Sequence, residues 1–349
     1  MNSNIELDDY SDFAEARVLT IPANLAGERL DAALATLVPE FSRSRLTSWI
    51  KEGLVTADEK PARPKDKVWG GERITVLAQP DPEETAFIAE DIPLDVVYED
   101  ASILVLNKPA GLVVHPGSGN WTGTLLNGLL FAYPELKTIP RAGIVHRLDK
   151  DTSGLMVVAR TLQAQNNLVQ QLQARSVKRH YLAVAQGKLT GEGTIDAPIG
   201  RHPRDRVKMA VVHSGKPAIT HWRALEQFAA HTLVECRLET GRTHQIRVHM
   251  AHIGHPLAAD PVYGGRPRLT SPELNLALED FQRQALHARK LSLQHPESGK
   301  TMSWKAPIPD DFDTLLLALR ADAGMSEEDW DNEDDWDDED DCEVIYVKD

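Results

Sequence analysis

The sequence feature that most constrains the fold is the apolar run GLMVVA at residues 154–159, which directly follows a dense group of charged side chains. A continuous apolar run of this length is typical of a strand that is buried on both faces. The run GIV at 143–145 precedes the charged group, so we predict two strands joined by a polar loop. A loop held by a rigid sheet is a common place for chemistry, and a solvated surface hairpin is the alternative. The charged side chains of the loop are Arg147, Asp149, Lys150 and Asp151.

Length and composition favour a soluble protein of about two domains. With 349 residues, the chain is long enough to bury a full enzyme core. It contains no apolar run as long as a membrane span, and its polar start lacks the pattern of a signal peptide. The two cysteines, Cys236 and Cys342, are too few for a disulfide framework or a four-cysteine zinc site. We therefore predict a cytoplasmic protein.

The formal net charge of −15 is concentrated at the two ends of the chain. Residues 1–15 contain five acids and no base, and residues 326–349 contain fourteen acids and one base, Lys348. The body between them, residues 16–325, therefore carries a net charge of +3. We predict a disordered acidic leader over 1–16 and a disordered acidic tail over 321–349. Local basic patches in the body, not the overall charge, decide whether it binds nucleic acid.

A small α+β module is predicted over residues 17–78. A short edge strand near residues 19–22 precedes a helix over 28–38, whose apolar residues recur at helical spacing. Ser42 stands at the N-cap position of a second helix, and Gly53 ends that helix. A basic helix face is commonly no more than solvated, and RNA contact is the functional alternative. The cations that this second helix exposes are Arg43, Arg45 and Lys51.

The segment 79–93 contains three prolines and is predicted to be a linker, and a large domain follows over 94–320. Helices and short strands in this domain do not alternate in the strict βαβ manner. We therefore predict an α+β fold with a mixed, mostly antiparallel sheet and flanking helices. The predicted helices lie near residues 124–130, 162–175 and 246–253, and the predicted strands include 179–185, 232–238 and 286–293.

Several familiar sites are excluded by the sequence. It has no GxxxxGK[ST] phosphate loop, no strand-borne GxGxxG and no HExxH helix. His249 and His252 are three residues apart, but no carboxylate or cysteine lies at ligand spacing. We therefore predict no metal site.

Three polar groups remain on predicted strands or at their ends, and they contain Asp149, Tyr181 and the run 242–247. Asp149 stands among cations, which favour its ionised form. An ionised carboxylate can attack a sugar carbon, as it does in retaining glycosidases. No second carboxylate is clearly placed as an acid, although Asp151 is close in sequence. The residues alone leave the reaction open.

Longer motifs resemble two known families. Residues 143–155, GIVHRLDKDTSGL, and 241–249, GRTHQIRVH, resemble two motifs of the RluA-type pseudouridine synthases, and Tyr181 falls in the motif between them. Within that family the layout is closest to the D-type members, which modify large-subunit (23S) ribosomal RNA. Residues 17–78 resemble the S4 RNA-binding domain, although TADEK at 56–60 departs from its pattern. Further matching segments are RLD at 29–31, SRSR at 42–45, GGERI at 70–74, VHPG at 114–117 and DPVYG at 260–264.

The resemblance implies isomerisation of uridine to pseudouridine within RNA, without a metal or an organic cofactor. Asp149 matches the family's nucleophile, Arg247 its basic partner, and Tyr181 the residue that stacks on the target base. Arg147 matches the residue that enters the RNA where the flipped-out base has left. Further RNA contacts are expected from Arg242, His244 and Gln245, and from Arg43, Arg45 and Lys51 of the S4 module.

The implied partner is ribosomal RNA or the pre-50S particle, with the helix 69 loop as the expected target and a role in ribosome assembly. We expect a monomer. One alternative is the same chemistry on another rRNA uridine or a tRNA uridine, and a second is a noncatalytic RNA-binding assembly factor. Asp149, Tyr181 and Arg247 together argue against the second alternative, since a pure RNA binder has no need of a carboxylate beside phosphates.

Overall fold

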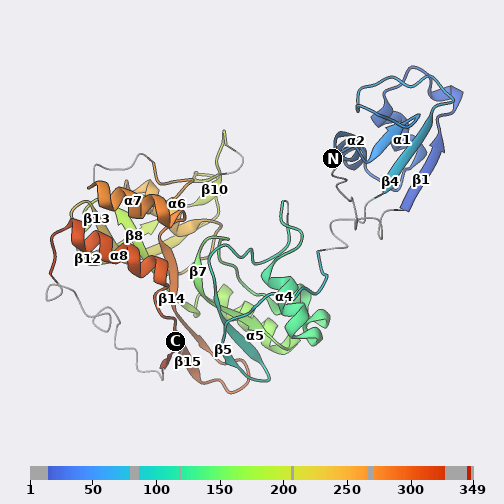
Figure 1. Cartoon of the computed structure of the whole chain (residues 1–349). Helices are drawn as coiled ribbons and strands as arrows, with labels where there is room; N and C mark the ends of the chain where they lie inside the picture. The colour runs from blue at the N-terminus through green and yellow to red at the C-terminus, as the bar shows by residue number, and fades with distance from the viewer. Residues whose placement is uncertain are drawn as a thin grey trace, which may run out of the picture. The chain divides into compact units, whose positions relative to one another are not determined.

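The computed structural model describes residues 15–78, 86–117, 119–205, 208–265, 271–326 and 344–346. The chain divides into two compact units, Met1–Thr85 and Ala86–Asp349 (Figure 1). Each unit has a hydrophobic core of its own. Within the described ranges, no helix combines the length and the apolar character needed to cross a membrane.

The small unit packs two helices against a four-stranded antiparallel sheet of order β1-β4-β2-β3. The hydroxyl of Ser42 accepts a hydrogen bond from the backbone N–H of Arg45, which confirms the predicted N-cap. The apolar stripe of the capped helix buries Leu46, Trp49 and Ile50. The elements are β1 (Glu15–Thr20), η1 (Ala23–Leu25), α1 (Leu30–Leu37), α2 (Arg43–Lys51), β2 (Val55–Ala57), β3 (Lys60–Pro61) and β4 (Arg73–Ala78).

The large unit is built on a ten-stranded sheet whose main path runs β5-β6-β7-β14-β8-β13-β12-β9, with β15 and β16 branching from β14. The pairs β7–β14 and β15–β16 are parallel, and the other described pairs are antiparallel. This confirms the predicted α+β class with a mixed, mostly antiparallel sheet. The main strands are β5 (Val96–Glu99), β6 (Ile103–Lys108), β7 (Ser153–Ala159), β8 (Lys178–Gln186), β9 (Glu192–Asp196), β12 (Ile219–Gln227), β13 (His231–Leu238), β14 (Leu286–Gln294), β15 (Thr301–Lys305) and β16 (Val344–Tyr346).

Helices cover both faces of this sheet, and α7 and α8 lie side by side (Figure 1). Leu155 and Val157 of β7 pack in one core cluster with residues of α5, while Met156 and Val158 pack in another with residues of α4 and α6. Burial on both faces explains why the run 154–159 is apolar without interruption. The remaining elements are α4 (Leu125–Ala132), η2 (Pro134–Thr138), η3 (Pro140–Gly143), α5 (Leu162–Gln173), β10 (Ile199–Arg201), β11 (Met209–Val211), α6 (Gln245–His252), α7 (Pro272–Phe281) and α8 (Asp310–Asp322).

The first arm of the predicted hairpin is not a strand. Residues 140–143 form the turn η3, and Ile144 makes only an isolated bridge to Val158. Gly143 has a φ of +76°, and a Cβ at this position would lie 1.9 Å from the carbonyl oxygen of Ala159. The glycine thus permits a close approach to the end of β7.

Two predicted boundaries near the small unit also need correction. The leader was expected to reach residue 16, but β1 begins at Glu15, which pairs with Ala78. The linker was expected to reach residue 93, but Ala86 is buried and its carbonyl oxygen accepts a hydrogen bond from Asn127. Residues 86–93 therefore belong to the large unit. Residues 1–14 and 79–85 lie outside the described residues.

The predicted acidic tail is partly ordered. Helix α8 continues to Asp322, and Val344–Tyr346 form β16 in parallel register with β15. Backbone hydrogen bonds to a sheet edge do not depend on an apolar sequence, so composition alone did not indicate this strand. The residues 327–343 and 347–349 of the expected tail lie outside the described residues.

Candidate active site

The loop that carries Asp149 runs from Ile144 to Thr152 and is fixed by hydrogen bonds to its backbone. The buried ammonium of Lys108 donates to the carbonyl oxygens of Pro109, Leu112 and Lys150 at 2.6, 2.9 and 2.9 Å. The backbone N–H of Thr152 donates to the carbonyl oxygen of Asp149 at 3.1 Å. These bonds tie the loop to the turn after β6 and leave little freedom for Asp149.

Further contacts hold the other end of this loop. Arg283 donates to the carbonyl oxygen of Asp151 at 3.3 Å, and Gln284 donates to the hydroxyl of Thr152 at 3.0 Å. Gly154 follows at the start of β7, and a Cβ there would lie 2.3 Å from the carbonyl oxygen of Ala288 on β14. The glycine lets β7 and β14 pair closely, which fixes the loop relative to the sheet.

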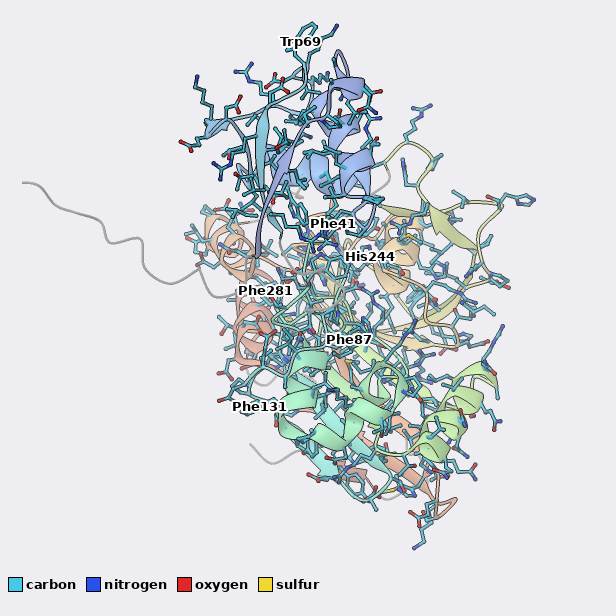
Figure 2. The ribbon with its side chains drawn as sticks, turned by 90° about the vertical axis from the view of Figure 1, so that its right-hand side faces the viewer. Phe41, Trp69, Phe87, Phe131, His244 and Phe281 are labelled. Carbon is cyan, nitrogen blue, oxygen red and sulfur yellow. The ribbon has the colours of Figure 1, made fainter. Side chains whose placement is uncertain are left out.

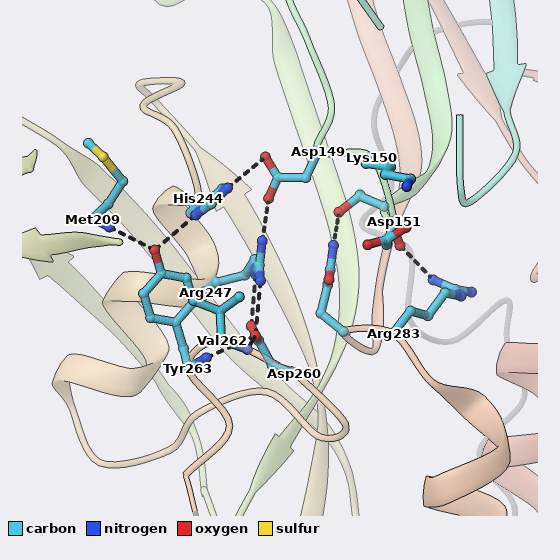
Figure 3. A network of polar contacts seen from close by, with 12 residues as sticks. Asp149, Lys150, Asp151, Met209, His244, Arg247, Asp260, Val262, Tyr263 and Arg283 are labelled. Carbon is cyan, nitrogen blue, oxygen red and sulfur yellow. Dashed lines mark hydrogen bonds and ion pairs between the residues drawn. The ribbon is translucent and has the colours of Figure 1, made fainter. Parts of the chain in front are cut away.

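Arg247 joins Asp149 to a second carboxylate, Asp260 (Figure 3). Its Nη1 donates to Asp149 Oδ2 at 3.1 Å, and its Nε and Nη2 donate to the two oxygens of Asp260 at 2.7 and 2.9 Å. The side chains of Arg247 and Asp260 are 5% and 0% exposed, whereas that of Asp149 is 16% exposed. The guanidinium is therefore anchored on Asp260 and presents one N–H to the more accessible Asp149.

The charge states of Arg247 and Asp260 follow from their surroundings. Burial raises the pKa of Asp260, but hydrogen bonds and the charge of Arg247, with the N–H groups of Tyr263 and Val262, outweigh burial and lower it. Burial lowers the pKa of Arg247, and the two carboxylates reverse that change and raise it. Both groups are thus ionised at neutral pH.

His244 lies on the other side of Asp149. Its Nε2 is 3.9 Å from Asp149 Oδ1, and its Nδ1 is 2.9 Å from the hydroxyl of Tyr263 (Figure 3). Burial lowers the pKa of His244, Arg247 and Arg147 lower it further, and Asp149 and Asp260 oppose the change. A neutral imidazole beside the carboxylate is the result.

Tyr181 lies on β8 and is buried, with 5% of its surface exposed. Burial raises the pKa of its hydroxyl, the charge of Arg179 opposes the change, and the charge of Asp149 adds to it. Tyr181 is therefore a neutral phenol at physiological pH, close enough to Asp149 to feel its charge.

The other predicted residues of this region separate into two kinds. Arg147 and Arg242 are exposed, and Arg242 donates one hydrogen bond to the carbonyl oxygen of Pro217 at 3.1 Å. Gln245 is 3% exposed, and its amide is fully used inside the protein. Its oxygen accepts from the Thr240 hydroxyl and the Arg242 N–H, and its nitrogen donates to the Ile219 carbonyl and the Thr220 hydroxyl. The prediction that Gln245 contacts RNA is wrong for this arrangement.

On the small unit, the predicted cations lie on α2. Arg43 and Lys51 are exposed, and Arg43 also contacts Asp31 at 3.1 Å. Arg45 lies over the rings of Phe41 and Trp49, at 5.2 and 4.9 Å from their centroids. Phe41 lies at the opposite end of the small unit from Trp69, a residue that is 68% exposed (Figure 2).

In the described ranges, no group of three His, Cys, Asp or Glu side chains is placed to hold an ion. His249, one of the histidines at helical spacing, is buried against the Thr220 hydroxyl and the Ala197 carbonyl oxygen. A cavity of about 610 Å³ lined by residues of β8, β9, β12 and β13 contains none of Asp149, Tyr181 and Arg247. We place the site at Asp149, where the buried charges converge, and not at this cavity.

Three residues of the site were not predicted from the sequence: Lys108, Asp260 and Tyr263. Asp260 and Tyr263 belong to the motif DPVYG, which supported the family resemblance but suggested no role. Burial lowers the pKa of Lys108 to about 7, while Asp151 and Asp149 oppose the change. The sequence signal that could have identified Lys108 is its position at the end of an apolar strand.

Comparisons with known proteins identify the family of the chain. Residues 102–252 match the family model described as RNA pseudouridylate synthase. A Neisseria meningitidis serogroup B protein named ribosomal large subunit pseudouridine synthase D is 57% identical over 364 residues, covering 99% of this chain and 97% of the relative. A Nitrosomonas europaea protein of the same name is 58% identical over 304 residues, covering 86% of this chain and 87% of the relative.

Solved structures give the same fold. The human RNA pseudouridylate synthase domain containing 4 matches with a TM-score of 0.51 and 26% identity, over 65% of this chain and 93% of that chain. A second human protein, RNA pseudouridylate synthase domain containing 1, matches with a TM-score of 0.50 and 27% identity, over 67% of this chain and 97% of that chain. This chain belongs to the family of RNA pseudouridine synthases, which isomerise uridine within RNA.

Proposed function

We propose that this chain converts specific uridines of large-subunit ribosomal RNA to pseudouridine, with the helix 69 loop as its target and Asp149 as its nucleophile. The main support for the proposal is the guanidinium of Arg247, which binds two carboxylates. It is held by the buried Asp260 and donates a hydrogen bond that orients the partly exposed Asp149. The names of the relatives support the rRNA substrate. The resemblance to D-type members supports the helix 69 loop.

The reaction breaks the N1–C1′ bond, forms a C5–C1′ bond, and moves a proton from C5 to N1. The target base must first leave its stack, at a cost of a few kcal/mol that a loop reduces. Asp149 then acts at the sugar, either by adding to C1′ or by removing a sugar proton. Arg247 keeps the carboxylate ionised and oriented during this step.

Tyr181 and Arg147 have separate roles in this proposal. The buried ring of Tyr181 stacks on the freed uracil while it turns, and its neutral hydroxyl is available for the C5 proton. Arg147 is exposed two residues before Asp149, and its planar guanidinium can fill the gap in the RNA by stacking on bases.

The small unit supplies affinity in this proposal. It acts as an S4 RNA-binding module in which Arg43, Arg45 and Lys51 contact phosphates. The enzyme acts in the cytoplasm on ribosomal RNA or the pre-50S particle.

Mapping pseudouridines in the rRNA of a deletion strain tests the proposal. We expect the helix 69 pseudouridines to disappear and to return with the wild-type gene but not with D149N. Unchanged rRNA together with lost tRNA pseudouridines would favour the alternative substrate. Unchanged pseudouridine everywhere, with a defect in ribosome assembly, would favour the noncatalytic alternative.

A further inference from the structure

His244 adopts a backbone conformation that few non-glycine residues adopt. It stands just before α6 with a φ of 56° and a ψ of 25°, in the left-handed region. Such conformations cost free energy and persist where the surroundings fix them, most commonly at functional sites. Here the conformation directs the imidazole between Asp149 and Tyr263 (Figure 3).

The hydrogen bonds of Tyr263 determine which imidazole nitrogen carries the proton. The backbone N–H of Met209 donates to the Tyr263 oxygen at 2.9 Å. The phenol still has one proton to donate, and the His244 Nδ1 lies 2.9 Å away. The arrangement that uses all these groups has Tyr263 donating to Nδ1, so that a neutral His244 carries its own proton on Nε2.

We propose that His244 is a positioning residue that donates its Nε2–H to Asp149, with its tautomer fixed by Tyr263. Arg247 holds Asp149 Oδ2 at 3.1 Å, and His244 faces the other oxygen, Oδ1, at 3.9 Å. The second distance is longer than a hydrogen bond, and such catalytic contacts tighten when substrate binds. His244 thereby holds the second oxygen of Asp149 while the first reaches the sugar. The inference rests on the proposed role of Asp149.

The groups around His244 agree with a neutral ring. The cations Arg247 and Arg147 oppose a positive charge on it, the carboxylates of Asp149 and Asp260 favour one, and Tyr263 is a neutral donor. Burial is the largest influence and lowers the pKa of His244, as Arg247 and Arg147 also do. A neutral donor orients the carboxylate without adding a second ion pair to the one that Arg247 already makes, which would weaken Asp149 further as a nucleophile.

Nitrogen-15 NMR of the labelled full-length protein tests the tautomer directly, since the two imidazole nitrogens differ strongly in chemical shift when only one is protonated. We expect His244 of the wild type to be the neutral Nε2–H tautomer at pH 7. In Y263F we expect a mixture of tautomers, since the donor to Nδ1 is gone. A wild-type His244 that is protonated on Nδ1, or that is already a mixture, would overturn the proposal.

Kinetics separate positioning from RNA contact. For H244A we expect kcat to fall by about 10²-fold, the effect of losing one oriented donor, while RNA affinity changes by less than about twofold. H244Q, which retains an N–H donor, should recover part of this loss. H252Q on the exposed end of α6 is the matched control and should behave like the wild type. If weaker RNA binding fully explains the loss of activity in H244A, then His244 is an RNA contact and the proposal is overturned.

The pH dependence gives an independent readout. The Tyr263 hydrogen bond stabilises the neutral ring, so its removal in Y263F raises the pKa of His244. The acid limb of the plot of kcat against pH should therefore move to higher pH in Y263F. An unshifted limb would contradict the proposal that Tyr263 fixes the tautomer of His244. If the wild type forms no pseudouridine on any RNA, the proposed function fails, while the nitrogen shifts still decide the tautomer.

Discussion

Two Arg–Asp clusters of this protein each pair a buried carboxylate with arginine, but their arginines differ in exposure. In the small unit, Asp31 contacts Arg29 and Arg43, whose side chains are 45% and 52% exposed. In the large unit, Asp260 contacts Arg247, whose side chain is 5% exposed. The Asp31 carboxylate is itself only 5% exposed, so the two clusters differ in the exposure of their arginines and not of their carboxylates. The half-exposed guanidinium groups of Arg29 and Arg43 remain accessible to a further anion, such as an RNA phosphate, while they pair with Asp31.

In the large unit both the arginine and the carboxylate are buried, so Arg247 is not accessible to a further anion in this way. Removing one member of a buried, hydrogen-bonded pair leaves an unpaired charge in the interior and costs about 3–5 kcal/mol. Arg247 is consequently held in one orientation, which suits the fixed geometry that catalysis needs. The difference suggests a division of labour in which the small unit provides affinity and the Asp260–Arg247 pair provides orientation.

The largest expected effect is on catalysis by the D149N variant. Loss of the nucleophile should lower pseudouridine formation by about 10⁴-fold or more, measured as tritium release from RNA labelled at C5 of uridine. RNA affinity should change little, because D149N removes none of the cations that are proposed to bind RNA. Turnover near that of the wild type would contradict the assignment of Asp149.

The comparison itself is tested by D260N and D31N. D260N should lower the free energy of unfolding by about 3–5 kcal/mol and also lower kcat, because it removes the main partner of a buried arginine. D31N leaves two half-exposed arginines that water solvates, so it should lower the free energy of unfolding by less, and it should leave kcat unchanged. Urea unfolding measures the free energy of unfolding of each variant, and tritium release measures its kcat. The pKa of Asp260 is lowered in the folded protein, so its stabilisation is present at neutral pH and disappears as the pH falls below the ordinary carboxyl range. Similar losses in the two variants would remove the distinction.

A smaller effect is expected at Tyr181, which lies on the wall of the catalytic region and carries no full charge. Y181F keeps the ring and should retain more activity than Y181A, which we expect to lose about 10²-fold, since stacking on a base contributes about 1–3 kcal/mol. Tritium release under single-turnover conditions compares them. Equal activities of Y181F and Y181A would contradict the proposed role of the ring.

The smallest effect on chemistry is expected on the small unit. The double variant R43Q/K51Q should weaken RNA binding and reduce the slope of log affinity against log salt by about 1–2, as expected for two lost phosphate contacts. Its kcat at saturating RNA should equal that of the wild type. Filter binding at several salt concentrations is the measurement. A reduced kcat would show that this face does more than supply affinity.

Features of the fold and the site could be predicted where they depend on neighbouring residues in the sequence, and not where they depend on contacts between distant segments. The helix cap at Ser42 and the strands at 179–185 and 232–238 follow from periodicity and cap chemistry, and the structure contains them. The linker boundary was wrong because Asn127, 41 residues further along the chain, binds the backbone at Ala86. The prediction for Gln245 was wrong because four partners saturate its amide, and two of them, Ile219 and Thr220, are 26 and 25 residues away in the chain.

The sequence by itself determined the buried strand after Asp149, the α+β class and the residues that carry the family motifs. Those properties depend on patterns within a few neighbouring residues. Only the tertiary structure decided that Arg247 bridges Asp149 to Asp260, and that Tyr263 reaches His244. These contacts join residues up to 98 positions apart. A contact between distant segments depends on how the sheet and helices pack, and no local pattern of side chains records it.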